Sequence, residues 1–210
     1  MTPAMRLVLP ALLDVSIPLR IGPEPDHGVA RLGGRAPAGV SLAKLGSEGR
    51  YFATVPLTED PDRVVSIFIG FTLDEMLDAA GDINSGSAFV ENVVHRPGPR
   101  RNDRAYESEI AAYSLVLEAP REDMVEDGDR YVVRSSHKIG GRPYFMHGDP
   151  MLESAVAALE REGFRQVVQF DLPGAEDEPI AADWPFGDGV FHVLGRPPFG
   201  EGDWRAFWEN

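Results

Sequence analysis

Two short segments of the sequence combine adjacent glycines with basic side chains. They are residues 31–35, which read RLGGR, and residues 138–142, which read KIGGR. Paired glycines allow backbone conformations whose N–H groups form a nest for an anion, and Arg35 or Arg142 would add a cation beside it. The same pattern is also typical of a tight turn or a close strand approach in a core, and we favour that interpretation.

Other motifs that could support catalysis or metal binding are incomplete. Ser135 and Lys138 have Ser-x-x-Lys spacing but lack the companion motifs of serine acyl-transferases, and the sequence contains no phosphate-binding loop or Gly-x-Ser-x-Gly turn. The histidines are too scattered for a local metal motif, although His147, Asp149, Asp188 and His192 could still converge through the fold. We therefore predict no catalytic residue, no metal and no cofactor.

The two glycine motifs also mark an internal repeat. Downstream of each motif come a strand that ends near a proline, an aromatic strand and a helix, in the same order. The second half has an additional helix after its motif, where the first half has a glycine-containing loop. This order predicts one domain over residues 1–210, built of two related halves at about 1–95 and 105–210.

Runs of apolar, β-branched and aromatic residues indicate a mainly β protein of the α+β class. The predicted strands are residues 6–9, 12–19, 51–57, 64–71, 88–94, 112–117, 131–135, 165–172 and 189–194. Helices are expected at residues 72–80, with a capping box, and at 150–162. A third, short helix is expected at the C-terminal end, with Trp204, Phe207 and Trp208 on one side.

Two further segments have a binding interpretation and a structural one. Residues 95–104, HRPGPRRNDR, could hold a phosphate or a carboxylate through arginine forks, or form an exposed connector between the halves. Seven aromatic residues within the last 27 positions could line a cleft or an interface, or pack as core. The structural interpretation is favoured for both segments.

The second half resembles a known family. Residues 138–143 (KIGGRP), 166–171 (QVVQFD) and 184–191 (WPFGDGVF) are similar in order to the Gly-Gly-x-Pro motif, the Leu/Val-x-Gln-x-Asp strand and the Trp-Gly-Asp-x-Gly turn of the YwqG-like bacterial proteins of unknown function. The resemblance covers about residues 135–210. It implies roll-like antiparallel sheets with internal pseudo-symmetry and a few peripheral helices, and it implies no established catalytic residues. Some members are associated with toxin or immunity neighbourhoods, which implies partner binding.

Charge and composition restrict the partners. The net charge of −14 opposes binding to nucleic acid and to anionic membranes, and it would steer a basic protein towards the chain. No apolar run reaches membrane-spanning length, and the absence of cysteine suits a reducing compartment, so we expect a cytoplasmic protein.

These observations predict a non-catalytic binding protein, with neutralisation of a basic toxin as its most concrete form. The alternative is a small-molecule binder or a hydrolase with a cleft between the halves. The residues that would meet in that cleft are Arg35, Arg142, Asp171, Asp188 and His192.

Overall fold

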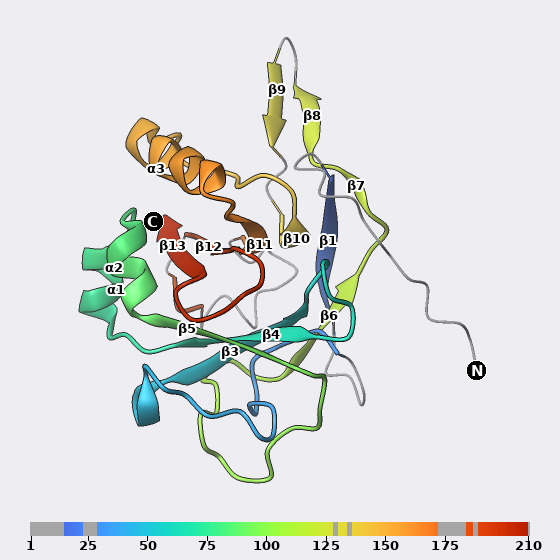
Figure 1. Ribbon diagram of the computed structural model, residues 1–210, viewed down its shortest axis with the longest axis vertical. Coiled ribbons are helices and arrows are strands. Elements are labelled where there is room, and N and C mark those ends of the chain that lie inside the picture. The colour runs from blue at the N-terminus through green and yellow to red at the C-terminus, as the bar shows by residue number, and fades with distance from the viewer. Residues whose placement is uncertain are drawn as a thin grey trace.

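The fold is dominated by one antiparallel sheet that is nearly closed on itself (Figure 1). The structure is a computed structural model, and it describes residues 15–22, 29–127, 130–133, 136–171, 184–186 and 189–209. The dominant sheet confirms the predicted mainly β class. The predicted strand at residues 6–9 lies outside the described residues.

The sheet has two arms that meet at its centre. One arm consists of β6 (Tyr113–Leu117), β2 (Arg31–Leu32), β3 (Arg50–Pro56), β4 (Val64–Ile69) and β5 (Val90–His95). The other consists of β1 (Val15–Gly22), β10 (Lys138–Gly140), β11 (Arg165–Phe170), β12 (Val190–Gly195) and β13 (Trp204–Glu209). The order across the sheet is β13-β12-β11-β10-β1-β6-β2-β3-β4-β5, so β13 and β5 form its two edges.

Three shorter strands complete the set in the described residues. Strand β7 (Arg121–Glu122) pairs with the beginning of β1. Strands β8 (Met124–Asp127) and β9 (Arg130–Val133) pair only with each other, and Figure 1 shows them extending away from the body of the molecule.

The two arms repeat the same arrangement after each glycine motif. Gly33, Gly34, Gly140 and Gly141 all have positive φ, at 65°, 72°, 70° and 75°. The strand that follows each motif in its arm, β3 or β11, carries a register shift at the corresponding place, between Tyr51 and Ala53 or between Gln166 and Val168. The first strand of each predicted half pairs with the motif of the other half, β1 with β10 and β6 with β2. The predicted halves therefore interlock.

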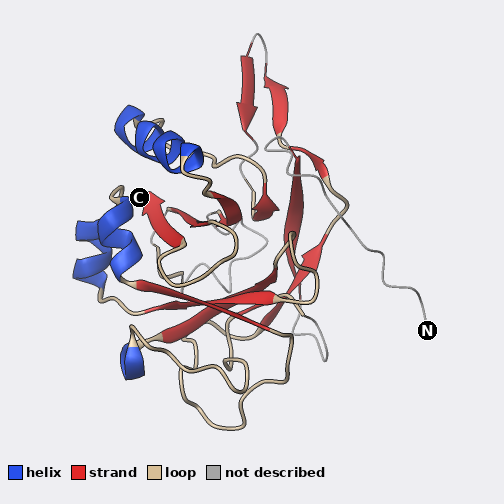
Figure 2. Ribbon diagram, in the orientation of Figure 1, coloured by secondary structure: helices blue, strands red, loops and turns tan. Residues whose placement is uncertain are grey.

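Helices cover the side of the sheet where its edges approach each other (Figure 2). Helix α1 (Leu73–Ala79) has the predicted capping box between Thr72 and Glu75, and α3 (Pro150–Arg161) begins after the predicted N-cap Asp149. Helix α2 (Ile83–Ala88) was not predicted from the sequence, and a short 3₁₀ turn, η1 (Gly46–Glu48), lies in the loop after the first motif. Among the described residues, no helix is long and apolar enough to cross a membrane.

The predicted C-terminal helix is wrong, because residues 204–209 form β13. This segment pairs with β12 over six residue pairs, from Val190 with Glu209 to Gly195 with Trp204. Successive side chains of a strand point to opposite faces of its sheet. Phe207 packs in a cluster with α3, whereas Trp208 packs in the main core. Because both faces of β13 are covered, its apolar residues do not alternate with polar ones, and the sequence loses the signal of a strand.

The main core is built on aromatic side chains inside the curled sheet. Phe52 makes edge-on contacts with Phe170, Trp184, Phe186 and Phe191, with ring centroids 5.1–5.6 Å apart. Most of the late aromatic residues therefore belong to the core. Two smaller apolar clusters lie elsewhere, one around α3 and one around Tyr51 and Phe68.

We predict that Gly33→Ala destabilises the fold much more than Gly39→Ala does. Both glycines have positive φ, but a Cβ at Gly33 would lie 2.2 Å from the Ala111 carbonyl oxygen, whereas nothing lies within 4 Å of one at Gly39. The clash with backbone should lower the free energy of unfolding by about 2 kcal/mol beyond the effect at Gly39. Urea unfolding of both variants measures this difference, and equal losses would show that the first motif tolerates a side chain.

Candidate functional site

The first glycine motif does not offer its glycine N–H groups to a ligand. The N–H of Gly33 donates to the Phe52 carbonyl oxygen at 2.7 Å, and that of Gly34 donates to the Ile110 carbonyl oxygen at 2.8 Å. Arg35 lies at the surface and forms an ion pair with Glu107, with 3.7 Å between Nε and Oε1. This motif therefore serves as a turn that ties β2 to its neighbours.

The second motif does hold an anion, and the chain itself supplies it. The buried Asp123 carboxylate accepts hydrogen bonds from the Arg142 backbone N–H at 2.8 Å, from the Ser16 hydroxyl at 2.9 Å, and from Lys138 Nζ at 2.9 and 2.8 Å. Lys138 and Asp123 both have fully buried side chains. Burial lowers the pKa of Lys138, and its hydrogen bonds to Asp123 oppose that shift. The predicted anion site is thus a structural ion pair.

The two motif arginines do not share a cleft. Strand β10 runs antiparallel to β2, because each of the three strand pairs between them is antiparallel. Gly140 lies opposite Ser16 of β1. Arg31 lies opposite Ser114 of β6, which itself lies opposite Gly22 of β1, so Arg31 is in the row of Gly22. At about 3.3 Å per residue these rows are about 20 Å apart, and the chain leaves β2 and β10 in opposite directions. Arg35 and Arg142 therefore lie far apart.

His192 is enclosed rather than exposed to a ligand. It is fully buried, and its ring stacks on Phe207 with centroids 4.5 Å apart. Neither ring nitrogen has a hydrogen-bond partner within the described residues, and Nε2 lies 3.9 Å from Glu209 Oε1. Burial, assisted by the positive charge of Lys138, lowers the pKa of His192 to about 3, so the ring is neutral at physiological pH.

The remaining predicted site residues are Asp171 and Asp188. Asp171 is half-buried, and its backbone N–H donates to His137 Nδ1 at 3.1 Å. Asp188 lies outside the described residues. The backbone N–H groups of Met146 and His147 donate to the Glu209 carboxylate. Within the described ranges, no group of three or more His, Asp and Glu side chains is placed to hold a metal ion.

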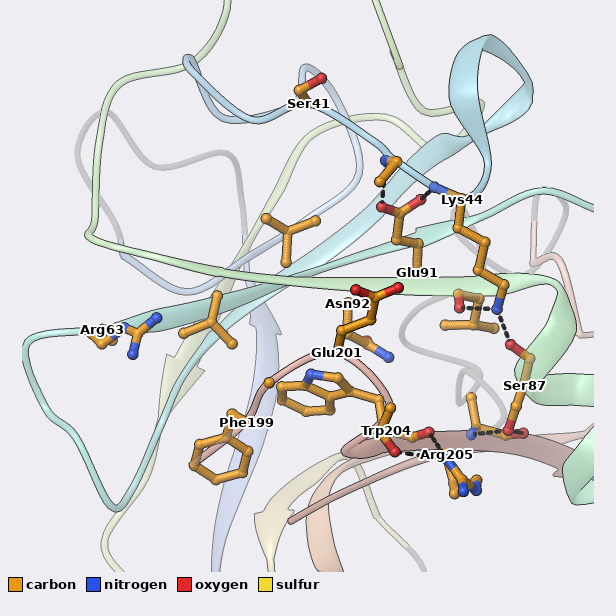
Figure 3. Close-up of a pocket in the computed structure, with 17 residues that line it drawn as sticks. Ser41, Lys44, Arg63, Ser87, Glu91, Asn92, Phe199, Glu201, Trp204 and Arg205 are labelled. Carbon is orange, nitrogen blue, oxygen red and sulfur yellow. Dashed lines mark hydrogen bonds between the residues drawn. The ribbon is translucent and has the colours of Figure 1, made fainter. Parts of the chain in front are cut away.

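A gap of about 500 Å³ lies between the two sheet edges (Figure 3). Five consecutive residues of β5, residues 90–94, line one side of it, and three consecutive residues of β13, residues 204–206, line the other. Successive side chains point to opposite faces, so an unbroken run of lining residues means that the strand edge itself borders the gap. The gap is thus the place where the sheet fails to close.

The edge of β5 has unpaired main-chain groups. The Gly70 N–H donates to the Phe89 carbonyl oxygen. In the antiparallel register, every second residue of β5 counted from Phe89 therefore bonds to β4. The main-chain groups of Val90, Asn92 and Val94 therefore face outward. Lys44 Nζ donates to the Val90 carbonyl oxygen at 3.1 Å. No hydrogen bond from the described part of the chain reaches the outward groups of Asn92 and Val94.

The edge of β13, in contrast, is largely capped. The Ala206 N–H donates to the Ser87 hydroxyl oxygen at 3.0 Å, and the Trp208 carbonyl oxygen accepts from the Gly81 N–H at 2.7 Å. Both partners belong to the segment that carries α1 and α2, which therefore protects this edge as a neighbouring strand would. The open edge that remains is that of β5.

Side chains around the gap supply polar and aromatic contacts. Glu91 accepts hydrogen bonds from the backbone N–H groups of Ala43, Lys44 and Leu45 at 2.7–2.9 Å, which fixes that loop beside β5. Lys44 also donates to the Ser87 carbonyl oxygen, as Figure 3 shows. Asn92 Oδ1 is buried at the gap and has no hydrogen-bond partner in the described residues.

An aromatic pair forms one wall of the gap. Phe199 and Trp204 stack with ring centroids 5.2 Å apart and planes inclined by 26°. Both lie beside the gap in Figure 3. The sequence could indicate these two only as core or cleft residues, and nothing in it marked β5 as an edge, because edge position depends on pairing between distant segments.

No family model, curated protein or solved structure matches this chain. The resemblance to the YwqG-like family therefore stays a prediction.

We predict that Lys138→Met lowers the free energy of unfolding by about 3–5 kcal/mol, because it leaves Asp123 buried and unpaired. The double variant Lys138→Met/Asp123→Leu should recover at least half of this loss. Arg165→Met is the control, since its pair with Glu59 is partly exposed and should contribute less than about 1 kcal/mol. Denaturant unfolding measures all three. An equally unstable double variant would mean that the pair is not the source of the stability.

A second prediction concerns acid stability. Below its ordinary pKa of 6.5, His192 takes up a proton in the unfolded chain but not in the folded chain, until the pH approaches about 3. Its contribution to stability is thus complete above pH 6.5 and is lost as the pH falls, by up to about 1.4 kcal/mol per pH unit. His192→Leu should flatten this part of the profile, whereas substitution of the exposed His147 by Gln should not. Unfolding measured from pH 7 to pH 4 tests this, and parallel profiles for wild type and His192→Leu would contradict it.

Proposed function

We propose that this chain is a non-catalytic binding protein that holds an extended segment of a protein partner in the gap between β5 and β13. The observation that carries the proposal is the open main-chain edge of β5 at Asn92 and Val94. An exposed edge of this kind pairs readily with a further strand. Binding would thus extend the sheet towards β13.

The gap offers contacts for both the main chain and the side chains of such a segment. The N–H and C=O groups of Asn92 and Val94 would pair with the partner's main chain. Each hydrogen bond contributes only about 0.5–1.5 kcal/mol net, so specificity must come from side chains. The Phe199 and Trp204 rings give an apolar surface for one partner side chain, and Asn92 Oδ1 gives a buried acceptor for a donor.

Charge favours a basic partner at long range. The net charge of −14 would speed the encounter with a cationic protein, and a basic toxin is the most concrete example. The gap itself contains Lys44, Arg63 and Arg205 as well as Glu91 and Glu201. The steering therefore comes from the whole surface, and the gap selects by hydrogen bonding and shape.

A pull-down from the native host with three baits tests the proposal. The baits are wild type, Val94→Pro and Val94→Ala. Proline at residue 94 removes an outward N–H and leaves the ladder with β4 intact, since the ladder bonds at this end are made by residues 93 and 95. We expect the partner to bind wild type and Val94→Ala within about threefold, and Val94→Pro at least about tenfold more weakly.

Two further measurements sharpen the result. Hydrogen exchange in the complex should slow at residues 90–94, and raised salt should weaken the association because encounter is electrostatic. A partner that binds Val94→Pro as tightly as wild type would exclude the gap as the binding site. If no basic partner with salt-sensitive binding is recovered, the proposed function itself is wrong.

A further inference from the structure

A buried cation in the first arm corresponds to Lys138 in the second. Arg31 precedes the first glycine motif as Lys138 precedes the second, and each lies opposite a polar residue of the next strand, Thr54 for Arg31 and Gln169 for Lys138. On the strand after that, Ser66 lies opposite Thr54 in the first arm, and His192 lies opposite Gln169 in the second. The two arms therefore place equivalent polar rows across the sheet, each beginning with a buried cation.

The two cations differ in how they are neutralised. Lys138 is paired with Asp123, whereas Arg31 has no carboxylate within 4.0 Å among the described residues, although it is only 6 % exposed. Its Nε has no hydrogen-bond partner there either. A buried charge without a counter-charge is unfavourable, since it has lost water and gained no partner. In the described part of the chain, the first arm thus has the cation of the pair without its carboxylate.

The described groups that contact or adjoin Arg31 are neutral or positive. Its guanidinium lies 5.9 Å from the centre of the Tyr51 ring, and the Tyr51 hydroxyl donates to Thr54 Oγ1 at 2.8 Å. Thr54 Oγ1 is hydrogen-bonded to Ser66 Oγ at 2.7 Å, and Ser66 Oγ is hydrogen-bonded to His95 Nε2 at 2.8 Å. This chain of hydrogen bonds orders the row but adds no negative charge.

A second arginine of this arm lies in the segment that follows β5. Residue Arg100 is held by a bridge to Pro37 and by backbone hydrogen bonds from Ala38 to Pro99 and from Arg101 to Ala36. Burial raises the pKa of Tyr51, and the positive charges of Arg31 and Arg100 oppose that shift. Arg100 also lines a surface hollow of about 600 Å³ with Arg35 and Arg101.

We propose that Arg31 binds a carboxylate ligand from outside the chain, in the way that Lys138 binds Asp123. A planar guanidinium matches the two oxygens of a carboxylate, and a carboxylate is the group that fills the corresponding place in the second arm. This proposal does not depend on the function assigned to the gap.

Nuclear magnetic resonance of the arginine Nε–Hε groups tests it directly, with sodium acetate as the probe. The Arg31 signal is identified by its loss in Arg31→Lys. We expect acetate to shift it with saturation, and sodium chloride of equal ionic strength to leave it nearly unchanged. No saturable shift, or an equal shift with chloride, would overturn the proposal. A response to sulfate or phosphate without one to acetate would overturn the assignment to carboxylates.

Variants separate the site from general charge effects. Arg31→Met should abolish acetate binding, measured by the line width of labelled acetate, and Arg31→Lys should weaken it at least fivefold. Arg104→Met removes the same charge from an exposed position and should bind like wild type. Equal binding by Arg31→Met would refute the site. If Arg31→Met does not fold, Arg31→Lys and the wild-type titration still decide the question.

Carboxylates of the chain that lie outside the described residues require a control. Glu24 and Asp26 lie between β1 and β2 in sequence, outside the described residues. The variant Glu24→Gln/Asp26→Asn should leave the Arg31 signal and its acetate titration unchanged. A shifted Arg31 signal before acetate is added, followed by tighter acetate binding, would show that the chain supplies its own carboxylate and would overturn an external ligand.

Discussion

The pairing of β1 with β6 is the constraint on which the rest of the structure depends. It runs over four residue pairs, from Leu19 with Leu117 to Gly22 with Ser114, and it joins the two arms into one sheet. Because each of these strands also pairs with the motif strand of the other half, neither half can complete its sheet alone. The antiparallel junction turns the two glycine motifs in opposite directions, and it leaves β5 and β13 as the edges that approach each other when the sheet curls.

Buried charge is handled differently in the two arms. In the second arm, Lys138 and Asp123 neutralise each other without contact with water, and His192 avoids the cost of burial by staying neutral. In the first arm, Arg31 occupies the place of Lys138, and the surrounding hydroxyl groups order its row without neutralising it. The glycines form turns in both arms, and in the second arm the Asp123 carboxylate is bound by Lys138, two residues before the first glycine.

The sheet edges show a similar asymmetry. Segment α1–α2 crosses to β13 and satisfies its outward main-chain groups through Ser87 and Gly81, whereas β5 keeps open groups at Asn92 and Val94. An open edge beside stacked aromatic rings is a liability for aggregation unless a partner uses it. Because the edge of β13 is capped and that of β5 is open, a further strand could pair with β5 but not with β13.

Local sequence patterns determined the mainly β class, the capped helices α1 and α3 and the two glycine turns, because capping boxes, strand periodicity and paired glycines act over a few residues. They failed at residues 204–209, where burial on both faces removes alternation, and at the predicted meeting of Arg35 with Arg142. Only the tertiary structure decided which strands are edges, which cation has a buried carboxylate and which side chains are enclosed. Those properties depend on pairings between residues more than a hundred positions apart, such as Ser16 with Asp123 and Ser87 with Ala206, and no local pattern encodes them.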